Sequence, residues 1–162
     1  MITFVRANLL DLDHSQAIVS LLDEYASSRE GGGESLSDIS KQRLPQALAQ
    51  RSFCHIVLAY HNEKPAGLAI CFESFSTFSC KAILNIHDFM IASQYRGQGL
   101  SKKLLKEVEI LAQELDCCKI TLEVLENNKI ARNAYHSCGF NSYELKPEFG
   151  RALFYEKKLA TH

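Results

Sequence analysis

The spacing of apolar residues predicts a short strand and two helices in the first third of the chain. Apolar side chains recur every three or four positions in residues 15–26 and again near residues 38–50, which is the period of an amphipathic helix. Residues 2–6 have the composition of an opening strand. Between the two helices, residues 27–37 hold consecutive glycines flanked by glutamates, which indicates a solvated acidic loop.

The middle of the chain has the composition of β-strands. Residues 54–61, 65–75 and 82–91 are rich in branched and aromatic side chains, and turn residues such as Asn62 separate them. Short turns can join only strands that run in opposite directions. We therefore expect an antiparallel meander.

A helix and another strand follow the meander. Apolar residues form one stripe along residues 100–115, with most of the lysines off that stripe, so this helix should cover one face of a sheet. Residues 118–125 alternate between apolar and polar side chains, as a strand does. Because a helix connects this strand to residues 82–91, we expect the two strands to be parallel neighbours.

The C-terminal part is expected to add one helix and two strands. Apolar residues recur at helical spacing in residues 129–138, and Gly139 follows as a cap. Residues 140–145 and 152–159 have strand-like patterns. The elements together predict one α+β (α/β) domain over residues 1–162, with a central mixed, mostly antiparallel sheet of six to seven strands and about four helices.

Composition and charge indicate the class of protein and the compartment in which it is expected. Apolar residues make up 46% of the chain and charged residues 23%, as in soluble globular proteins, and the net charge of −1 gives no general attraction to nucleic acid or membrane lipid. No apolar run reaches the roughly 18 residues of a membrane span, and no export signal opens the chain. The six cysteines lack metal-site spacing. We expect a cytoplasmic protein with reduced, mostly buried thiols and no metal.

A glycine-containing turn between strand 82–91 and helix 100–115 is the main candidate for ligand binding. It runs Gln94-Tyr95-Arg96-Gly97-Gln98-Gly99-Leu100-Ser101. Glycine permits a positive φ and a close approach of the backbone, and the N-terminus of a helix carries partial positive charge. The turn therefore suits an anionic group such as a pyrophosphate.

The spacing of the glycines in this turn distinguishes between the known nucleotide-binding motifs that it could represent. The chain has no G-x-x-x-x-G-K-[ST] string, and a dinucleotide-binding fingerprint starting at Gly97 would need glycine or alanine where Lys102 stands. The pattern [QR]-x-x-G-x-[GA] does match, at Gln94, Gly97 and Gly99. Here the sequence resembles the GCN5-related N-acetyltransferase (GNAT) superfamily. The downstream block of Asn127-Asn128, Tyr135 and Gly139-Phe140 resembles the same family, so the detailed resemblance covers roughly residues 85–140.

The resemblance implies a GNAT fold in which the strand before the loop splays from its parallel neighbour and the pantetheine arm of acetyl-CoA lies between them. Many family members have glycine or alanine where this chain has Ser101, whose hydroxyl can still bond a phosphate. A backbone N–H in residues 89–91 would stabilise the oxyanion of the tetrahedral intermediate. The residues that the resemblance assigns to acetyl-CoA binding are Phe89, Met90, Ile91, Gln94, Arg96, Gly97, Gln98, Gly99, Leu100, Ser101, Lys102, Asn128 and Tyr135.

The resemblance also assigns a general acid. Tyr135 matches the family tyrosine that hydrogen-bonds or protonates the departing sulfur, although an aromatic residue in the buried stripe of a helix can also serve packing alone. A thiol with a pKa near 8.5 needs only modest help to leave. Asn128 would hold the CoA arm or cap the helix that follows it.

The base that accepts the proton of the amine has three candidates, His87, Asp88 and Glu123. An alkyl amine near pKa 10 must lose a proton before it attacks. In the polyamine-acetylating branch of the superfamily, a carboxylate stands at the position that matches His87. Strand alternation predicts that His87 shares a face with Asn85 and Phe89, and that Asp88 shares the opposite face with Ile86 and Met90.

The expected reaction is direct attack of a primary amine on acetyl-CoA, or on a slightly longer acyl-CoA. A Cys54–His55 dyad is excluded because neighbours in a strand face apart, and no G-x-S-x-G occurs. Acidic residues in the first third of the chain favour a small cationic acceptor; they are Asp23, Glu24, Glu30, Glu34 and Asp38. Acetylation of a protein amine and a CoA-binding sensor without turnover are the alternatives, and a homodimer is allowed.

Overall fold

The computed structural model describes residues 1–160 and contains one five-stranded sheet with four α-helices. The strands are β1 (Ile2–Arg6), β2 (Cys54–His61), β3 (Lys64–Ser76), β4 (Lys81–Ile91) and β5 (Lys119–Leu122). The helices are α1 (Leu12–Ser27), α2 (Asp38–Ala49), α3 (Leu100–Glu114) and α4 (Lys129–Ser137). Short 3-10 turns are η1 (Arg29–Gly31), η2 (Ser93–Tyr95) and η3 (Pro147–Phe149).

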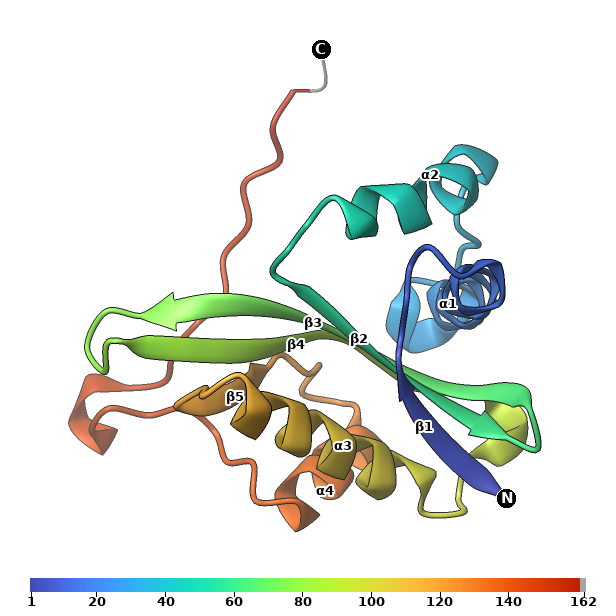
Figure 1. The fold of residues 1–162 in the computed structure, drawn as a ribbon. Helices are drawn as coiled ribbons and strands as arrows, with labels where there is room; N and C mark the ends of the chain where they lie inside the picture. Colours follow the sequence, from blue (N-terminus) through green and yellow to red (C-terminus); the bar gives the residue numbers. More distant parts are fainter. Residues whose placement is uncertain (161–162) are drawn as a thin grey trace.

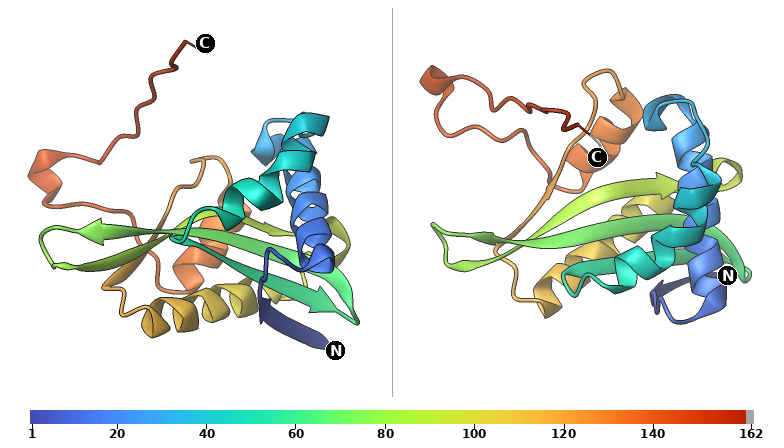
Figure 2. Two further views of the ribbon diagram at one scale, coloured as in Figure 1. Left: turned by 45° about the horizontal axis from the view of Figure 1, so that its top comes forward. Right: turned by 90° about the horizontal axis from the view of Figure 1, so that it is seen from above.

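The sheet order follows the chain, β1-β2-β3-β4-β5. The first four strands pair antiparallel, and β5 pairs parallel to β4, as the helical connection through α3 predicts. Helices α1 and α2 lie over one face of the sheet, whereas α3 and α4 lie over the other (Figures 1 and 2). The predicted mixed, mostly antiparallel α+β fold is confirmed.

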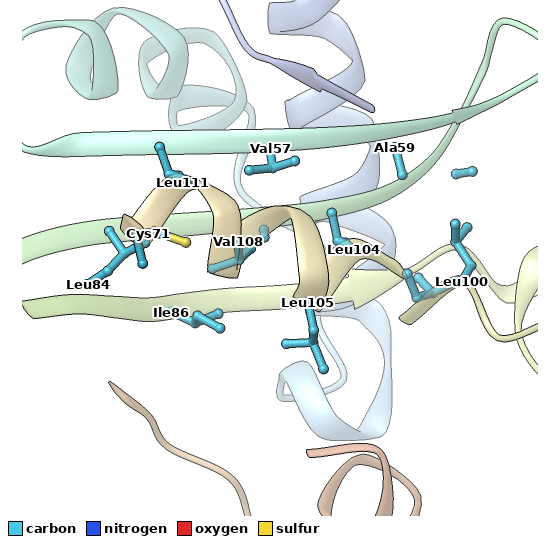
Figure 3. Close-up of a cluster of buried hydrophobic side chains, with 14 residues drawn as sticks. Val57, Ala59, Cys71, Leu84, Ile86, Leu100, Leu104, Leu105, Val108 and Leu111 are labelled. Carbon is cyan, nitrogen blue, oxygen red and sulfur yellow. The ribbon is translucent and has the colours of Figure 1, made fainter. Parts of the chain in front are cut away.

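Two apolar layers fix this arrangement, one on each face of the sheet. Under α3, Leu104 and Val108 pack with Val57, Cys71 and Leu84 from three neighbouring strands (Figure 3). On the other face, a second cluster joins α1 and α2 to the sheet; its buried members include Ile18, Leu21, Leu48, Leu58, Leu68 and Ile70. Alternation along each strand sends successive side chains to opposite layers.

A β-bulge at His87 interrupts the pairing of β3 with β4. Ile70 pairs with Asp88 and the next residue, Cys71, pairs with Ile86, so His87 has no partner on β3. An extra residue in one strand bends that strand and redirects the side chains that follow it. The bulge lies four residues before Ile91, the last residue of β4.

Because of the bulge, the side chains of β4 do not point to the faces of the sheet that the sequence predicted. Ile86 packs in the cluster under α3, but Met90 packs in the cluster under α1. The prediction that Ile86, Asp88 and Met90 share a face is therefore wrong. Phe89 packs on the side of Ile86 rather than with His87. Simple alternation fails here because the inserted residue shifts the period by one.

The C-terminal region also departs from the sequence prediction. Residues 140–145 and 152–159 were expected to form strands, yet they lie outside the sheet, and β5 covers 119–122 rather than 118–125. The sheet therefore has five strands instead of six to seven. A strand-like pattern is a local property, whereas a strand also needs a partner edge to pair with. Residues 141–160 run mostly extended and exposed past the sheet (Figure 1).

Two smaller differences have local causes. Helix α1 begins three residues earlier than predicted, because the Asp11 carboxylate accepts the backbone N–H groups of Asp13 and His14 and caps it. The thiols are free, as expected, but they are not mostly buried, since Cys80, Cys118 and Cys138 are exposed. Across residues 1–160, the helices are too short or too polar to cross a membrane.

Candidate active site

The glycine loop after β4 forms an open cradle at the N-terminus of α3. Gly97 and Gly99 have φ values of 75° and 74°, in the left-handed region that favours glycine, and no atom lies within 4 Å of a Cβ built at either position. Gly99 is the N-cap of α3 and offers no side chain to its free N–H groups. Such a cradle can bind phosphate oxygens through backbone N–H groups and the helix dipole.

Hydrogen bonds hold this loop in place before any ligand binds. The Nε of Arg96 donates to the carbonyl of Ile91 at 2.9 Å, and Nε2 of Gln98 donates to the carbonyl of Gln94 at 3.2 Å. From α1, Oε1 of Glu24 accepts the backbone N–H of Ser93 at 2.7 Å. Sequence reasoning placed Glu24 among the acidic residues around the acceptor and missed this link, which joins residues 69 positions apart.

The other predicted residues of the loop divide into buried and exposed side chains. Leu100 is 4% exposed and packs in the cluster under α3, so a ligand can meet only its backbone. Ser101 is half-buried and Lys102 is exposed in the first turn of α3. The ammonium group of Lys102 can therefore approach a phosphate from solvent.

Strand β5 ends beside this loop while β4 continues, and the stretch of the β4 edge that this leaves unpaired is here called the opening between β4 and β5. Their parallel pairing starts at Ile83 with Lys119 and ends at Ile86 with Leu122. Beyond that point β4 continues to pair with β3 through residues 88–91, so its opposite edge faces the opening. Met90 and Ile91 have buried side chains. These two residues can therefore meet a ligand only through their backbone groups.

Tyr135 of α4 lies next to this opening, in an aromatic stack. Its ring makes edge contacts with Phe89 at 6.0 Å between centroids and with Phe140 at 5.9 Å. Burial raises the pKa of the Tyr135 phenol to about 12, and the charge of Tyr25 adds to the rise. The phenol therefore stays protonated at any assay pH and can donate a proton or a hydrogen bond.

Asp88, Tyr25 and Glu30 form an electrostatic group on the α1 side of the site. Burial raises the pKa of the Asp88 carboxyl above 3.8, and the charge of His87 partly opposes this rise. Burial also raises the pKa of the Tyr25 phenol, with smaller contributions from the charges of Asp88 and Glu30. A carboxylate that is costly to ionise is a stronger base than an exposed one.

His87 and Glu123 occupy more open positions. His87 is exposed, and its ring lies 5.2 Å from that of Phe72 on the same side as the α1 cluster. Glu123 follows the last residue of β5 and is exposed. Among the hydrogen bonds, ion pairs and ring contacts within residues 1–160, none joins Glu123 to His87, Asp88 or Tyr135. His87 and Asp88 thus both lie on the side of the sheet that carries α1, His87 beside Phe72 and Asp88 near Tyr25.

Asn128 and Asp23 have structural partners. The Oδ1 of Asn128 accepts the N–H of Ala131 at 3.1 Å and caps α4, which leaves the amide Nδ2 as its donor toward a ligand. Asp23 pairs with Lys41 at 2.8 Å and accepts the N–H of Leu36, and these contacts lower its pKa. The negative charge of Asp23 is therefore largely compensated. Glu30 and Asp88 are the carboxylates whose charges act on Tyr25.

The spacing of the histidine, cysteine and acidic side chains decides whether they could bind a metal ion. No group of three histidine, cysteine, aspartate or glutamate side chains in the part of the chain that the structure describes could hold a metal ion. The ion pair between His55 and Glu73, at 3.2 Å, links neighbouring strands instead.

Comparison with known proteins agrees with this geometry. The sequence model of the Acetyltransferase (GNAT) family matches residues 17–140. The chain is similar to the thialysine N-epsilon-acetyltransferase of Bos taurus, with 30% identity over 65% of this chain and 69% of the relative. It is also similar to the spermine/spermidine N(1)-acetyltransferase of Bacillus subtilis (strain 168), with 42% identity over 32% of this chain and 35% of the relative.

A solved structure described as a probable acetyltransferase has the same fold. Its TM-score is 0.80 at 23% identity, and the match covers 97% of this chain and 99% of the other. GNAT acetyltransferases use acetyl-CoA, and the open glycine cradle beside the parting of β4 and β5 fits such a donor. The chain belongs to the GNAT acetyltransferase family and is an N-acetyltransferase.

Proposed function

We propose that this enzyme transfers an acetyl group from acetyl-CoA to a primary amine of a small cationic acceptor, by direct attack in a ternary complex. The observation that carries the proposal is the grouping of three features around one opening. The opening between β4 and β5 leads from the glycine cradle to the half-buried Tyr135 on one side and to Asp88 on the other. The names of two relatives, which refer to thialysine and to spermine and spermidine, support the acceptor class.

The donor occupies the cradle and the opening. The pyrophosphate meets the N–H groups of residues 97–101, with Lys102 at the rim. The pantetheine arm lies along the outer edge of residues 89–91, where it replaces the missing β-strand partner and meets the amide of Asn128. A backbone N–H of this edge donates to the thioester oxygen as negative charge develops there.

The acceptor enters from the α1 side, where carboxylates concentrate. The negative charges of Glu30 and Asp88 both raise the pKa of the Tyr25 phenol. A cationic amine placed near Tyr25 is attracted to both carboxylates, and this attraction offsets the repulsion between them. Asp88 takes the proton from the ammonium group, directly or through water. We favour Asp88 over the exposed His87 and Glu123 because Asp88 is half-buried and burial raises the pKa of its carboxyl, and His87 then serves as the route for the proton to solvent.

Asp88, Tyr135 and solvent water account for every proton that this reaction moves. The neutral amine nitrogen attacks the carbonyl carbon, and the carbonyl oxygen becomes the oxyanion. As the intermediate collapses, the carbon–sulfur bond breaks and Tyr135 donates its proton to the departing sulfur. The attacking nitrogen, which in the intermediate carries one proton more than the amide keeps, releases that proton to water. The products are an amide and the CoA thiol. Tyr135 regains a proton from solvent, and the proton held by Asp88 is released through the open His87 side.

An amine screen tests the acceptor class. Thiol release from acetyl-CoA is followed with thialysine, spermidine, an aminoglycoside, a lysine-containing peptide and n-butylamine as a monocation of similar reach. We expect kcat/KM for spermidine or thialysine to exceed that for butylamine by roughly 10-fold, because the second charge meets the carboxylates near Tyr25. Equal values for all small amines, or turnover of the peptide alone, would overturn the proposed acceptor.

The domain organisation, location and oligomeric state of the enzyme are predicted from its sequence alone. We propose that residues 1–162 form one domain, that the protein is cytoplasmic and that it works as a homodimer. The donor can also carry an acyl group slightly longer than acetyl. Substitution of propionyl-CoA for acetyl-CoA in the same screen measures this tolerance.

A further inference from the structure

Three neighbouring rings form a strip on the face of the sheet that carries α1 and α2. They belong to Phe53, Phe72 and His87, a set here called the aromatic strip. The ring centroids of Phe53 and Phe72 lie 6.0 Å apart, and those of Phe72 and His87 lie 5.2 Å apart. Phe72 packs at the edge of the apolar cluster under α1, whereas Phe53 is 47% exposed and His87 is exposed. The strip therefore leads from the core of the protein into solvent.

The aromatic strip begins beside Asp88, the proposed base. Asp88 pairs with Ile70 across the strands, and Phe72 stands two residues farther along β3. Residues two apart in a strand share a face, so Phe72 lies on the side of Asp88, roughly 7 Å farther along the strand. His87 occupies the bulge next to Asp88, and its ring lies against Phe72. A ligand bound at Asp88 can thus reach the strip without crossing the sheet.

The helices leave this part of the sheet uncovered. Figures 1 and 2 show that α1 and α2 lie over the end of the sheet near β1, while the hairpin end of β3 and β4 extends past them. Toward β5, Asn85 is the strand partner of Phe72, and its Nδ2 donates to Oγ1 of Thr121 at 3.0 Å. The aromatic strip thus has a polar border on the β5 side and an exposed end at Phe53.

Exposed rings beside a charged site favour an apolar ligand group. Binding sites combine apolar and aromatic walls with a few polar groups that fix the orientation of the ligand. In this protein the polar groups are the carboxylates of Asp88 and Glu30 near Tyr25, and the aromatic strip continues from them as an apolar wall. A carbon chain that covers the rings removes apolar surface from water, so each of its methylene groups adds binding free energy.

We propose that the aromatic strip selects acceptors that carry an apolar arm beyond their second nitrogen. This inference rests on the proposed function, in which the reactive amine faces the thioester and the second nitrogen lies near Tyr25. From that nitrogen the arm extends across His87 and Phe72 onto Phe53. The strip determines which acceptor binds, and the bond changes stay with the acceptor amine, the donor and the groups already described.

The aromatic strip distinguishes substituted diamines from amino acids. An amino acid acceptor carries a carboxylate beside its second nitrogen, and this group would face the carboxylates of Asp88 and Glu30. A diamine with an alkyl group on its second nitrogen places methylene groups on the rings instead. The preference therefore depends on the arm and not on the number of positive charges.

A series of N-alkyl trimethylenediamines tests the aromatic strip, because its members share two nitrogens at one spacing and differ only in the arm. Thiol release from acetyl-CoA is followed with the N-methyl, N-ethyl, N-propyl and N-butyl compounds. In the wild type we expect kcat/KM to rise about twofold to fourfold with each methylene group, so that the butyl compound exceeds the methyl compound by roughly 10-fold or more. The gain should lie in KM for the acceptor, with kcat and KM for acetyl-CoA unchanged.

Substitutions of exposed phenylalanines locate the preference. Phe53→Ser removes the solvent end of the aromatic strip and should reduce the butyl-to-methyl ratio to below about threefold. Phe53→Leu keeps an apolar surface and should keep most of the ratio. The matched control is Phe78→Ser, since Phe78 is 100% exposed in the turn between β3 and β4 and lies outside the strip. Its ratio should equal that of the wild type.

The outcomes separate this inference from the proposed function. If the wild type turns over no small amine, both are overturned. Turnover with equal kcat/KM across the series, a wild-type ratio in Phe53→Ser, or an equal loss in Phe78→Ser overturns the role of the aromatic strip alone. If Phe53→Ser fails to fold, as judged by far-ultraviolet circular dichroism, His87→Ser takes its place. The ratio compares two acceptors in one enzyme, so a change of kcat common to both does not affect it.

Discussion

The phenol of Tyr135 can be removed without removing its packing, and this makes Tyr135→Phe the most informative substitution. Phenylalanine keeps the edge contacts to Phe89 and Phe140, so the free energy of unfolding should change by less than about 1.5 kcal/mol. What is lost is the proton donor. General acids contribute about 10²-fold to 10⁴-fold, and the low end applies because a thiol with a pKa near 8.5 is already a fair leaving group. We expect kcat to fall about 100-fold, or about 2.7 kcal/mol.

The assay compares kcat and KM for acetyl-CoA in the wild type, in Tyr135→Phe and in the control Tyr60→Phe. Tyr60 is another partly buried tyrosine with a raised pKa, but its ring packs on His14 of α1 rather than on Phe89 and Phe140. KM for acetyl-CoA should stay the same in both variants, because the phenol acts on the sulfur only as it departs. Because the pKa of Tyr135 is about 12, its ionisation should cause no loss of wild-type kcat below about pH 10. A wild-type kcat in Tyr135→Phe, or a change confined to KM, would refute the assignment.

Two further substitutions test the donor cradle and the proposed base. Gly97→Ala should lower the free energy of unfolding by roughly 1–2 kcal/mol, because Gly97 has a positive φ, and should raise KM for acetyl-CoA about 10-fold. The control is Gly33→Ala, since Gly33 has a φ of 82° and equally open surroundings. It should lower the stability by a similar amount and leave KM unchanged. Asp88→Asn should reduce kcat about 100-fold yet raise the melting temperature at about pH 8, because burial raises the pKa of this carboxyl and makes its ionised form unfavourable. That gain should shrink as the pH falls toward 3.8, and a melting temperature lowered at every pH would contradict the reasoning.

Much of the fold could be predicted because its elements depend on local patterns. The three strands of the meander and helix α3 begin and end within about two residues of the expected bounds, since alternation and helical spacing are repeated along each segment. The parallel pairing of β4 and β5 also followed, because a helical crossover leaves few other arrangements. The glycine loop was recognisable for a similar reason: the residues that form the cradle are consecutive in the chain.

The catalytic side of the site was harder to predict because it depends on contacts between distant segments. The link from Glu24 to Ser93 and the charges around Tyr25 join α1 to β4 and its loop, and no pattern within either segment indicates them. A distinguishing sign was nevertheless present in His87-Asp88, where two adjacent polar residues interrupt the alternation of a mostly apolar strand. Such an interruption is a signal for a bulge, because a regular strand would place one of the two in the core.

The bulge on β4 and the unpaired tail have the same physical origin, and this connects the two errors of prediction. The alternation of side chains along a strand predicts which of them share a face only where each residue pairs with one residue of the neighbouring strand. In addition, a segment forms a strand only where the edge of another strand is available to pair with it. At His87 the partner strand supplies one residue too few, which turns Asp88 toward α1, the side from which the acceptor is proposed to enter. At residues 152–159 the chain supplies a strand-like segment without a partner, while β5 keeps a free edge.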